Sequence, residues 1–256
     1  MNWPRRQAAQ AIASHAVAEG LIVAALLAWW LTARGLPSYV LPAPIETARQ
    51  LALLFIDPAF LGDTLISLAR VVAAVALAVA IGGGLAVFAR FVPMSSYAVD
   101  RRLMPVLNSF PAVAWALLAA FWFRPGNFSV ITVEVLILIP FCAFSIVQGL
   151  ADLDRDLVEM GRSFSRSPWS IALKIIMPLL LPYIMSSVRI AYGIGWKIAL
   201  VAELFGAQRG LGYLMLQAEV SSNTAMVFAT CFAIVIIFVA GERLVIDPLA
   251  RRFGRY

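Results

Sequence analysis

The amino-acid sequence predicts an all-α integral membrane protein with six transmembrane helices. Hydrophobic residues make up 62% of its 256 residues and charged residues only 13%, and the mean hydropathy is +0.89. A soluble domain of this size has no use for so much apolar surface, so lipid must be the solvent for most of the chain. No Pro/Gly/Ser linker, low-complexity tract or short-period repeat divides the sequence, which indicates one membrane domain.

Six windows of the sequence are long and apolar enough to cross a bilayer. A span needs about 20 mostly apolar residues, because roughly 30 Å of hydrocarbon is crossed at about 1.5 Å per residue. The windows are 16–33, 64–89, 104–123, 129–149, 180–206 and 225–246. We therefore divide the chain into residues 1–63, with an N-terminal tail, the first span and an external segment, and residues 64–256, a core of five spans.

Basic residues indicate which way the chain crosses the membrane. With both termini in the cytoplasm, thirteen arginines and lysines fall on the inner side and four on the outer side. The four outer residues are Arg34, Arg49, Arg124 and Arg209. This excess satisfies the positive-inside rule, and the reverse topology does not. The net charge of +6 is spread over several loops, a distribution that favours membrane anchoring over nucleic-acid binding.

The sequence lacks the patterns that nucleotide, metal or nucleophilic chemistry would need. A phosphate-binding P-loop contains Gly-Lys followed by Ser or Thr, and neither Lys174 nor Lys197 follows a glycine. Cys142 and Cys231 lie inside apolar runs and His15 stands alone, so we interpret all three as packing residues. We expect no catalytic residue, no metal site and no cofactor in this chain.

One long polar segment, residues 154–178, interrupts the apolar spans on the cytoplasmic side. Its first acidic residues precede its basic ones, the order that a helix dipole favours, so we expect a first helix over 154–164. Ser167 is a good N-cap and Pro168 suits the first turn, so we expect a second helix from Trp169. The segment therefore predicts a helix–turn–helix that projects from the bilayer.

The polar segment resembles the EAA loop of binding-protein-dependent ABC importer permeases. The family pattern is Glu-Ala-Ala, three residues, Gly, nine residues, Ile, one residue and Leu-Pro. The segment aligns with this pattern without a gap. The Glu-Ala-Ala positions hold Glu159, Met160 and Gly161, and the Ile, Leu and Pro positions hold Ile175, Met177 and Pro178. Ser165 replaces the glycine, a departure that matters because glycine permits a tight turn that serine tolerates less readily.

The resemblance extends over nearly the whole chain and indicates the nitrate/sulfonate/taurine subfamily. The residues LPAP at 41–44 resemble its Leu-Pro-Ser-Pro after the first span. The run at 64–88 is similar to its second span, and VAELFGAQRGLGYLMLQA at 201–218 is similar to its Val-Ala-Glu and Gly-Leu-Gly-Tyr segments.

This resemblance implies a type I ABC importer permease fold with a cytoplasmic coupling helix, in a bacterial inner membrane. It implies two permease copies, expected to be a homodimer, that line a translocation path. A periplasmic binding protein would deliver the solute, and a separate ATPase would bind ATP and Mg, so this chain would not be an enzyme. The resemblance assigns ATPase coupling to Asp156, Glu159, Met160, Gly161, Arg162, Ser165, Arg166 and Pro178.

Charged residues inside the spans are informative, because a charge buried in lipid needs a partner or a water-filled path. Arg70 and Arg189 lie near enough to the ends of their spans to extend to the outer and inner surface, respectively, so we interpret both as structural residues. Lys197 lies near mid-bilayer, and Glu203 lies six positions after it, which places them about 120° apart around the helix. Lys197 therefore either faces the path, where it favours a small anion, or pairs with Glu134 or another carboxylate.

Aromatic residues provide further candidates for the path, together with Lys197 and Glu203. Phe110 precedes Pro111, a predicted kink, and kinked backbone can line a cavity. Trp115 lies in the same aromatic stretch, although ordinary packing would also explain both side chains. The external segment 44–55 is predicted to form an amphipathic surface helix that contacts the binding protein or lies in the membrane interface.

An ion-coupled secondary transporter is the alternative function. It would use Lys197 and Glu203 as coupling groups and would need inverted repeats, of which the sequence shows no clear sign. The sequence favours the permease of an ATP-driven importer for a small anionic solute, such as nitrate, a sulfonate or taurine. Glycines at 82–84, 193 and 195 would permit the two helix packings that transport requires, or simply close helix contact.

Overall fold

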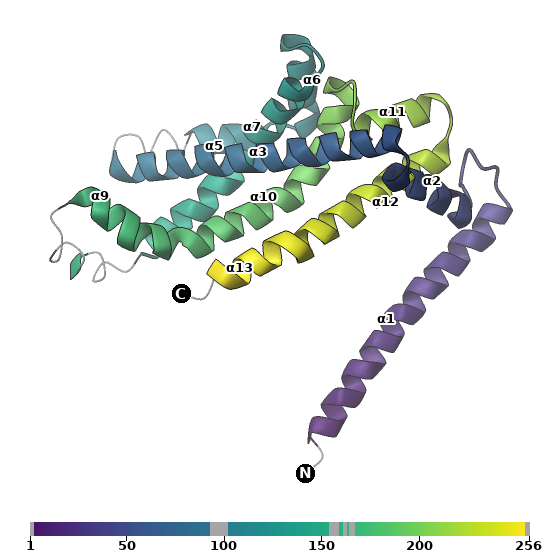
Figure 1. The fold of residues 1–256 in the computed structure, drawn as a ribbon, viewed down its shortest axis with the longest axis horizontal. Coiled ribbons are helices and arrows are strands. Elements are labelled where there is room, and N and C mark those ends of the chain that lie inside the picture. Colours follow the sequence, from purple (N-terminus) through teal and green to yellow (C-terminus); the bar gives the residue numbers. More distant parts are fainter. Residues whose placement is uncertain (1–2, 93–101, 154–158, 161–162, 164–166, 254–256) are drawn as a thin grey trace.

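The computed structural model describes residues 3–92, 102–153, 159, 160, 163 and 167–253, and within them every regular element is a helix (Figure 1). The α-helices are α1 (Trp3–Arg34), α2 (Pro44–Ile56), α3 (Pro58–Phe91), α5 (Met104–Ser109), α6 (Ala112–Trp122), α7 (Asn127–Ala151), α9 (Pro168–Ile171), α10 (Met177–Gly206), α11 (Leu211–Val220), α12 (Thr224–Gly241) and α13 (Asp247–Phe253). The π-helical turn η2 (Ala172–Ile176) lies between α9 and α10, and the π-helical turn η3 (Glu242–Ile246) lies between α12 and α13.

Helices α3, α7 and α10 form the centre of the fold. Small residues let them approach closely: a Cβ on Gly82 of α3 would lie 2.8 Å from the carbonyl oxygen of Ile139 in α7. Likewise, a Cβ on Gly149 of α7 would lie 2.5 Å from Cγ of Tyr183 in α10. Close helix contact therefore accounts for Gly82, as it commonly does for small residues between membrane helices.

Helices α1 and α2 precede this centre. Helix α1 extends away from the other helices (Figure 1), and near its end Trp29 donates from Nε1 to the carbonyl of Pro42 (3.0 Å). The Trp29 ring also stacks on Phe228 of α12. Helix α2 packs on α12 and α3 and buries Thr47 and Leu54, so a helix is present where the sequence predicts one over 44–55.

The predicted third span is divided into α5 and α6. Phe110, between them, has extended backbone (φ −81°, ψ 127°), and Pro111 is the N-cap of α6. A proline lacks an N–H and pushes the preceding residue out of the helical region, so one helix ends here and another begins. The kink that the sequence predicts at Pro111 is thus a complete break.

Pro178 and Pro248 are each preceded by a π-helical turn, η2 and η3 respectively. The backbone N–H groups of Met177 and Asp247 each bond to the carbonyl five residues earlier. A proline ring crowds the carbonyl four residues before it, and local widening of the helix relieves that contact. Consequently α9, η2 and α10 run on as one long helix (Figure 1).

Four described helical segments are long and apolar enough to cross a membrane, judged by length and composition. They are Pro58–Arg90, Asn127–Ala151, Trp169–Gly206 and Thr224–Arg252, and they contain the second, fourth, fifth and sixth predicted spans. The first predicted span lies in α1, and the third is split between α5 and the shorter apolar helix α6.

Candidate functional site

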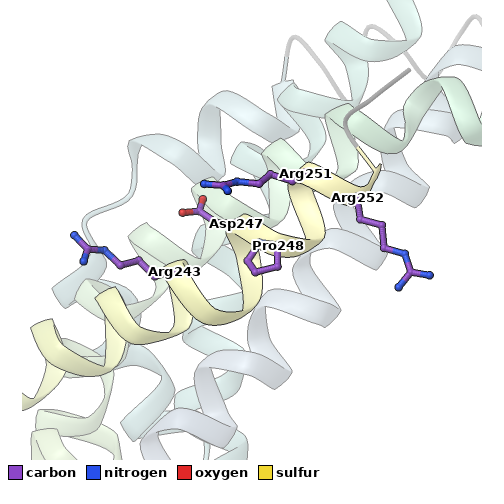
Figure 2. A pocket seen from close by; sticks show the side chains of 5 residues that line it. All are labelled: Arg243, Asp247, Pro248, Arg251 and Arg252. Carbon is purple, nitrogen blue, oxygen red and sulfur yellow. The ribbon is translucent and has the colours of Figure 1, made fainter.

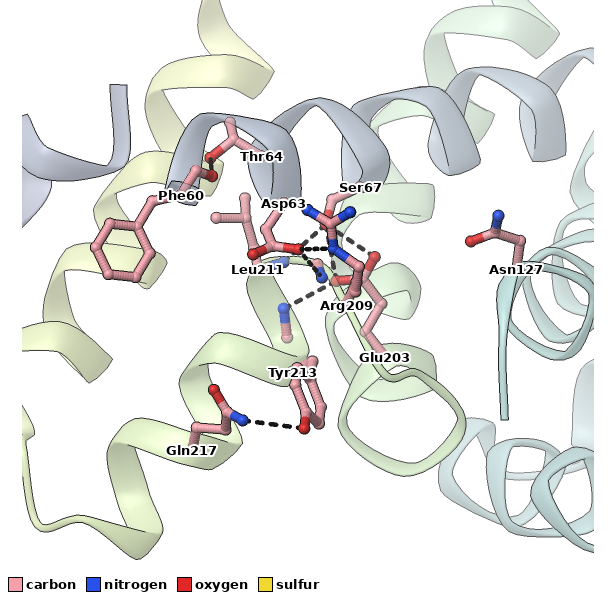
Figure 3. Close-up of polar contacts among 12 residues, drawn as sticks. Phe60, Asp63, Thr64, Ser67, Asn127, Glu203, Arg209, Leu211, Tyr213 and Gln217 are labelled. Carbon is pink, nitrogen blue, oxygen red and sulfur yellow. Dashed lines mark hydrogen bonds and ion pairs between the residues drawn. The ribbon is translucent and has the colours of Figure 1, made fainter. Parts of the chain in front are cut away.

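Polar residues from several parts of the chain meet where α3 begins and α10 ends, and we call them the Arg70 cluster. Its members are Asp63, Ser67 and Arg70 of α3, Asn127 of α7, Glu203 of α10 and Arg209 of the following loop. Figure 3 shows Asp63, Ser67, Glu203 and Arg209 converging beside the start of α11. The members on α3 are spaced by four and three residues, which places them on one helix face.

Arg70 and Glu203 form the centre of the cluster. Their side chains are 4% and 1% exposed, and Nη1 of Arg70 lies 2.6 Å from Oε1 of Glu203. Arg70 also donates from Nη1 to the Arg209 carbonyl (2.7 Å) and from Nε and Nη2 to Oδ1 of Asn127 (2.9 and 2.6 Å). The guanidinium thereby connects α3 with α7, α10 and the loop.

The expectation that Arg70 extends to the membrane surface is therefore wrong. A buried charge is tolerated where a counter-charge and additional hydrogen bonds replace water. Arg70 has both, and its acceptors come from positions far from it in the sequence. The role of Arg70 is to hold helices together.

The Arg70 cluster also caps the N-terminus of α11. Three successive backbone N–H groups, those of Gly210, Leu211 and Gly212, donate to side chains of other helices. The acceptors are, in the same order, Asp63 Oδ1 at 3.2 Å, Ser67 Oγ at 2.8 Å and Glu203 Oε2 at 2.8 Å. The first N–H groups of a helix have no partner within it, and the helix dipole favours carboxylates there.

Glycine is required at two positions of this cap. Gly210 has φ 118°, in the left-handed region that side chains disfavour. A Cβ on Gly212 would lie 2.6 Å from Cβ of Glu203 and 2.7 Å from the carbonyl oxygen of Leu200. The loop can therefore reach Glu203 only because these residues have no side chain.

Glu203, a predicted path residue, faces the interior of the helix bundle. It accepts hydrogen bonds from Ser67 (2.8 Å) and the Gly212 N–H (2.8 Å) as well as from Arg70. In this conformation its carboxylate is enclosed by α3, α10 and the loop before α11.

Lys197, the other charged path candidate, lies on an exposed face of α10. It forms neither an ion pair nor a hydrogen bond with any residue that the structure describes. It does not pair with Glu134, which is 0% exposed on α7 and whose carboxyl oxygens have no hydrogen-bond partner among the described residues. Ile190, seven residues before Lys197 on the same face, is also exposed.

The aromatic path candidates lie beside each other. The ring centroids of Phe110 and Trp115 are 4.7 Å apart at an interplanar angle of 54°, and Phe110 is 39% exposed. The indole N–H of Trp115 is buried with no partner in the described part of the chain. Helix α6 packs on α10, so Trp115 and Lys197 lie on neighbouring helices. Glu203 is not grouped with them, because it belongs to the Arg70 cluster.

The predicted coupling residues fall partly outside the described residues. Those outside are Asp156, Gly161, Arg162, Ser165 and Arg166. Glu159 and Met160 are exposed, and Pro178 is exposed in the first turn of α10.

The predicted start of the second helix in the polar segment is confirmed. Pro168 is the first residue of α9, and Oγ of Ser167 accepts from the backbone N–H of Ser170 (3.4 Å). Exposed apolar side chains accompany the polar ones here: Trp169 is 73% exposed and Leu173 is 52% exposed.

A second ion cluster, the Arg189 cluster, joins α10 to the C-terminal helices. Nε of Arg189 lies 3.1 Å from Oε1 of Glu242, and Nη2 bonds to Oδ1 of Asp247. The side chains are 48% exposed for Arg189 and 30% for each carboxylate. Arg189 is thus partly exposed, as the sequence predicts, and it is paired with two carboxylates that the sequence did not identify.

Sequence reasoning also missed Asp63, Ser67 and Asn127. One signal was available, because an acid, a hydroxyl and a base at positions 63, 67 and 70 share one face of an otherwise apolar helix. Among the described residues, no group of three histidines, cysteines, aspartates or glutamates could hold a metal ion.

Relatives of this chain are found among ABC transporter subunits. The family model described as binding-protein-dependent transport system inner membrane component matches residues 82–253. A Brucella melitensis protein named "Probable ABC transporter permease protein" is 31% identical over 84% of this chain and 87% of its own length. The Escherichia coli taurine transport system permease protein TauC is 27% identical over 85% of this chain and 82% of its own length.

A solved structure shows the same fold. A chain from the inward-facing conformations of the MetNI methionine ABC transporter matches with a TM-score of 0.63 and 17% identity, over 76% of this chain and 96% of that chain. The match confirms the predicted ABC importer permease fold. With the family match over residues 82–253, it follows that this chain belongs to the inner-membrane components of binding-protein-dependent transport systems and is an ABC transporter permease subunit.

Proposed function

We propose that two copies of this chain form the translocation path of an importer for a small solute with an anionic group. The observation that carries the proposal is Lys197, an exposed cation on a membrane-spanning helix with no acidic partner among the described residues. A lysine at this depth is accommodated where it faces a water-filled cavity. Two such lysines about a two-fold axis would form a cationic constriction that attracts anions.

The chemistry of one relative supports this substrate class. TauC is named as the permease protein of a taurine transport system, and taurine carries a sulfonate group. Trp115, on α6 beside α10, and Phe110, whose ring contacts that of Trp115, would supply apolar walls next to the lysine.

The polar segment would receive force from a separate ATPase chain. Met160, Trp169 and Leu173 are 52%, 73% and 52% exposed, and apolar side chains displayed among charges are typical of a surface that another protein covers. We propose the same coupling role for Arg162 and Arg166, which lie outside the described residues.

A continuous helix would carry that force to the path. Because α9, η2 and α10 form one helix, displacement of Trp169 would be transmitted along the axis to Lys197. In this proposal both termini lie in the cytoplasm, ATP is bound and hydrolysed only by the partner, and a periplasmic binding protein delivers the solute.

The test compares Lys197→Met with Lys197→Arg in the complete transporter, reconstituted with its ATPase and binding protein. We expect the methionine variant to lose at least about tenfold in sulfonate uptake, while binding-protein-stimulated ATP hydrolysis and assembly persist. The arginine variant retains the charge and should retain most uptake. Normal uptake by Lys197→Met would overturn the proposal, as would a loss of stimulated ATP hydrolysis that parallels the loss of uptake.

The same reconstitution separates this function from ion-coupled transport. Glu203 is fully engaged by Arg70, Ser67 and Gly212, so it is not available as an ion-coupling group in this conformation. We expect that liposomes containing this chain alone will not take up solute against its concentration gradient. Uphill transport under those conditions would favour the ion-coupled alternative.

A further inference from the structure

A hollow of about 660 Å³ opens on the surface of the C-terminal helical segment. It is lined by Arg243, Asp247, Pro248, Arg251 and Arg252. Figure 2 shows the side chains of Arg243 and Arg251 on either side of Asp247, whereas that of Arg252 points away from them. Arg243 and Arg251 thus lie along the same side of the helical segment, and both line the hollow.

Among the described residues that line this hollow, three are arginines and one is an aspartate. Its carboxylate, Asp247, is already paired with Arg189, and so is the neighbouring Glu242. Arg243 and Arg251 are exposed, and neither forms an ion pair with any residue in the described part of the chain. The arrangement can therefore accept an anion without first breaking an ion pair of Arg243 or Arg251.

Large apolar side chains are exposed on the same helical segment as the hollow. Leu244, Val245 and Leu249 are 76%, 55% and 44% exposed on the same segment, which is the end of the candidate span Thr224–Arg252. Leucine and valine side chains at the end of a span contact lipid tails, while long arginine side chains reach the headgroups. This combination favours a lipid over a soluble protein as the occupant.

We propose that this hollow binds the phosphate group of an anionic phospholipid, with Arg243 and Arg251 as the donors. A guanidinium presents paired N–H groups that match two phosphate oxygens, and its charge is never lost. Basic pockets at the ends of membrane helices bind anionic headgroups by this chemistry. The site would make the stability of the C-terminal segment depend on the lipid, independently of which solute is transported.

The test measures lipid binding to the full-length purified chain in detergent by native mass spectrometry. We expect phosphatidylglycerol to bind more tightly than phosphatidylcholine of the same acyl chains. Arg243→Gln and Arg251→Gln should each weaken phosphatidylglycerol binding by about fivefold, the contribution of one basic residue near a membrane surface, and leave phosphatidylcholine binding unchanged. Arg90→Gln is the matched control, because Arg90 is an exposed arginine in the last turn of α3 and outside the hollow.

Three outcomes would overturn the proposal. They are equal binding of the two lipids, unchanged affinity in both glutamine variants, and an equal loss in Arg90→Gln. A further arm adds inorganic phosphate at constant ionic strength, and displacement of the lipid by phosphate would identify a general anion site instead. Should a glutamine variant fail to fold, Arg251→Lys keeps the charge but not the paired donors, and it should bind phosphatidylglycerol more weakly than the native chain.

Discussion

The Arg70 cluster and the Arg189 cluster lie in the same helix bundle but in different environments. Arg70 and Glu203 are 4% and 1% exposed, whereas Arg189 and its carboxylates are 48% and 30% exposed. The first pair is surrounded by further hydrogen bonds to three other elements, and the second is open to its surroundings. Losing one partner of a buried pair leaves an unpaired buried charge, whereas an exposed pair is screened.

This difference indicates which part of the bundle is rigid. The Arg70 cluster fixes the ends of α3, α7, α10 and α11 relative to one another, so we expect these ends to move as a unit. The Arg189 cluster joins α10 to η3 and α13 weakly, on the side where the polar segment lies. A transport cycle that alternates between two packings would place its adjustable contacts there.

The largest expected effect is that of Arg70→Met. It leaves Glu203 buried without its counter-charge, so we expect a loss of about 3–5 kcal/mol in unfolding free energy. The measurement is the thermal unfolding midpoint of the purified protein in detergent. Arg124→Met, at an exposed arginine before α7, is the control and should behave as the native protein.

A double variant tests whether the loss belongs to the pair. The effect of Arg70→Met with Glu203→Gln should be smaller than the sum of the single effects, because the second substitution removes the unpaired charge. Additive effects would show that Arg70 and Glu203 act independently and would contradict the rigid-end interpretation.

The next largest effect is expected for Gly212→Ala. The added Cβ would overlap Cβ of Glu203 at 2.6 Å and the carbonyl oxygen of Leu200 at 2.7 Å, and such overpacking costs about 1–3 kcal/mol. Gly84→Ala is the matched control, since nothing lies within 4 Å of its added Cβ. The control should leave the unfolding midpoint unchanged or raise it slightly.

A smaller effect is expected for Arg189→Gln. Ion pairs that are this exposed contribute about 0.2–1 kcal/mol, and salt screens them. Thermal unfolding at low and high salt should therefore show a small destabilisation that diminishes as salt is added. A loss as large as that of Arg70→Met would contradict the distinction between the two clusters.

The smallest effect is expected for Glu134→Leu. This variant tests whether a buried carboxyl stabilises the fold when it has no hydrogen-bond partner. Glu134 is as buried as Glu203, but its oxygens have no partner among the described residues. Removing an unpartnered buried carboxyl should leave the unfolding midpoint unchanged or raise it, whereas Glu203→Leu should lower it. Equal losses in the two variants would show that Glu134 makes a stabilising bond.

The features that the sequence predicts well are those set by local chemistry. The second, fourth, fifth and sixth spans were predictable because the length of an apolar run decides whether a helix can cross a bilayer. The interruption at Pro111, predicted as a kink and found as a break, and the helix start after Ser167 follow from proline geometry and side-chain capping, which act within a few residues.

The features that it does not predict depend on packing between distant segments. Arg70 and Glu203 are 133 positions apart in the sequence, and nothing near Arg70 identifies its partner. Helix α11 was missed for the same reason, because its first N–H groups are capped by side chains of α3 and α10 and not by its own N-cap, Gly210. The sequence left open whether Lys197 faces the path or pairs with a carboxylate, because spacing along a helix gives depth but not the direction in which a neighbouring helix turns its side chains.

The π-helical turn before Pro178 has a consequence for how the polar segment is presented. An α-helix advances by about 100° per residue, so the extra residue in η2 rotates everything before it by about that angle. Trp169 therefore faces a direction that an uninterrupted helix would not give it, although Pro178 lies about 13 Å away along the axis. A single residue removed between 172 and 176 would turn this surface sideways without detaching it, and the ATPase proposed to bind there would meet a different side of the same helix.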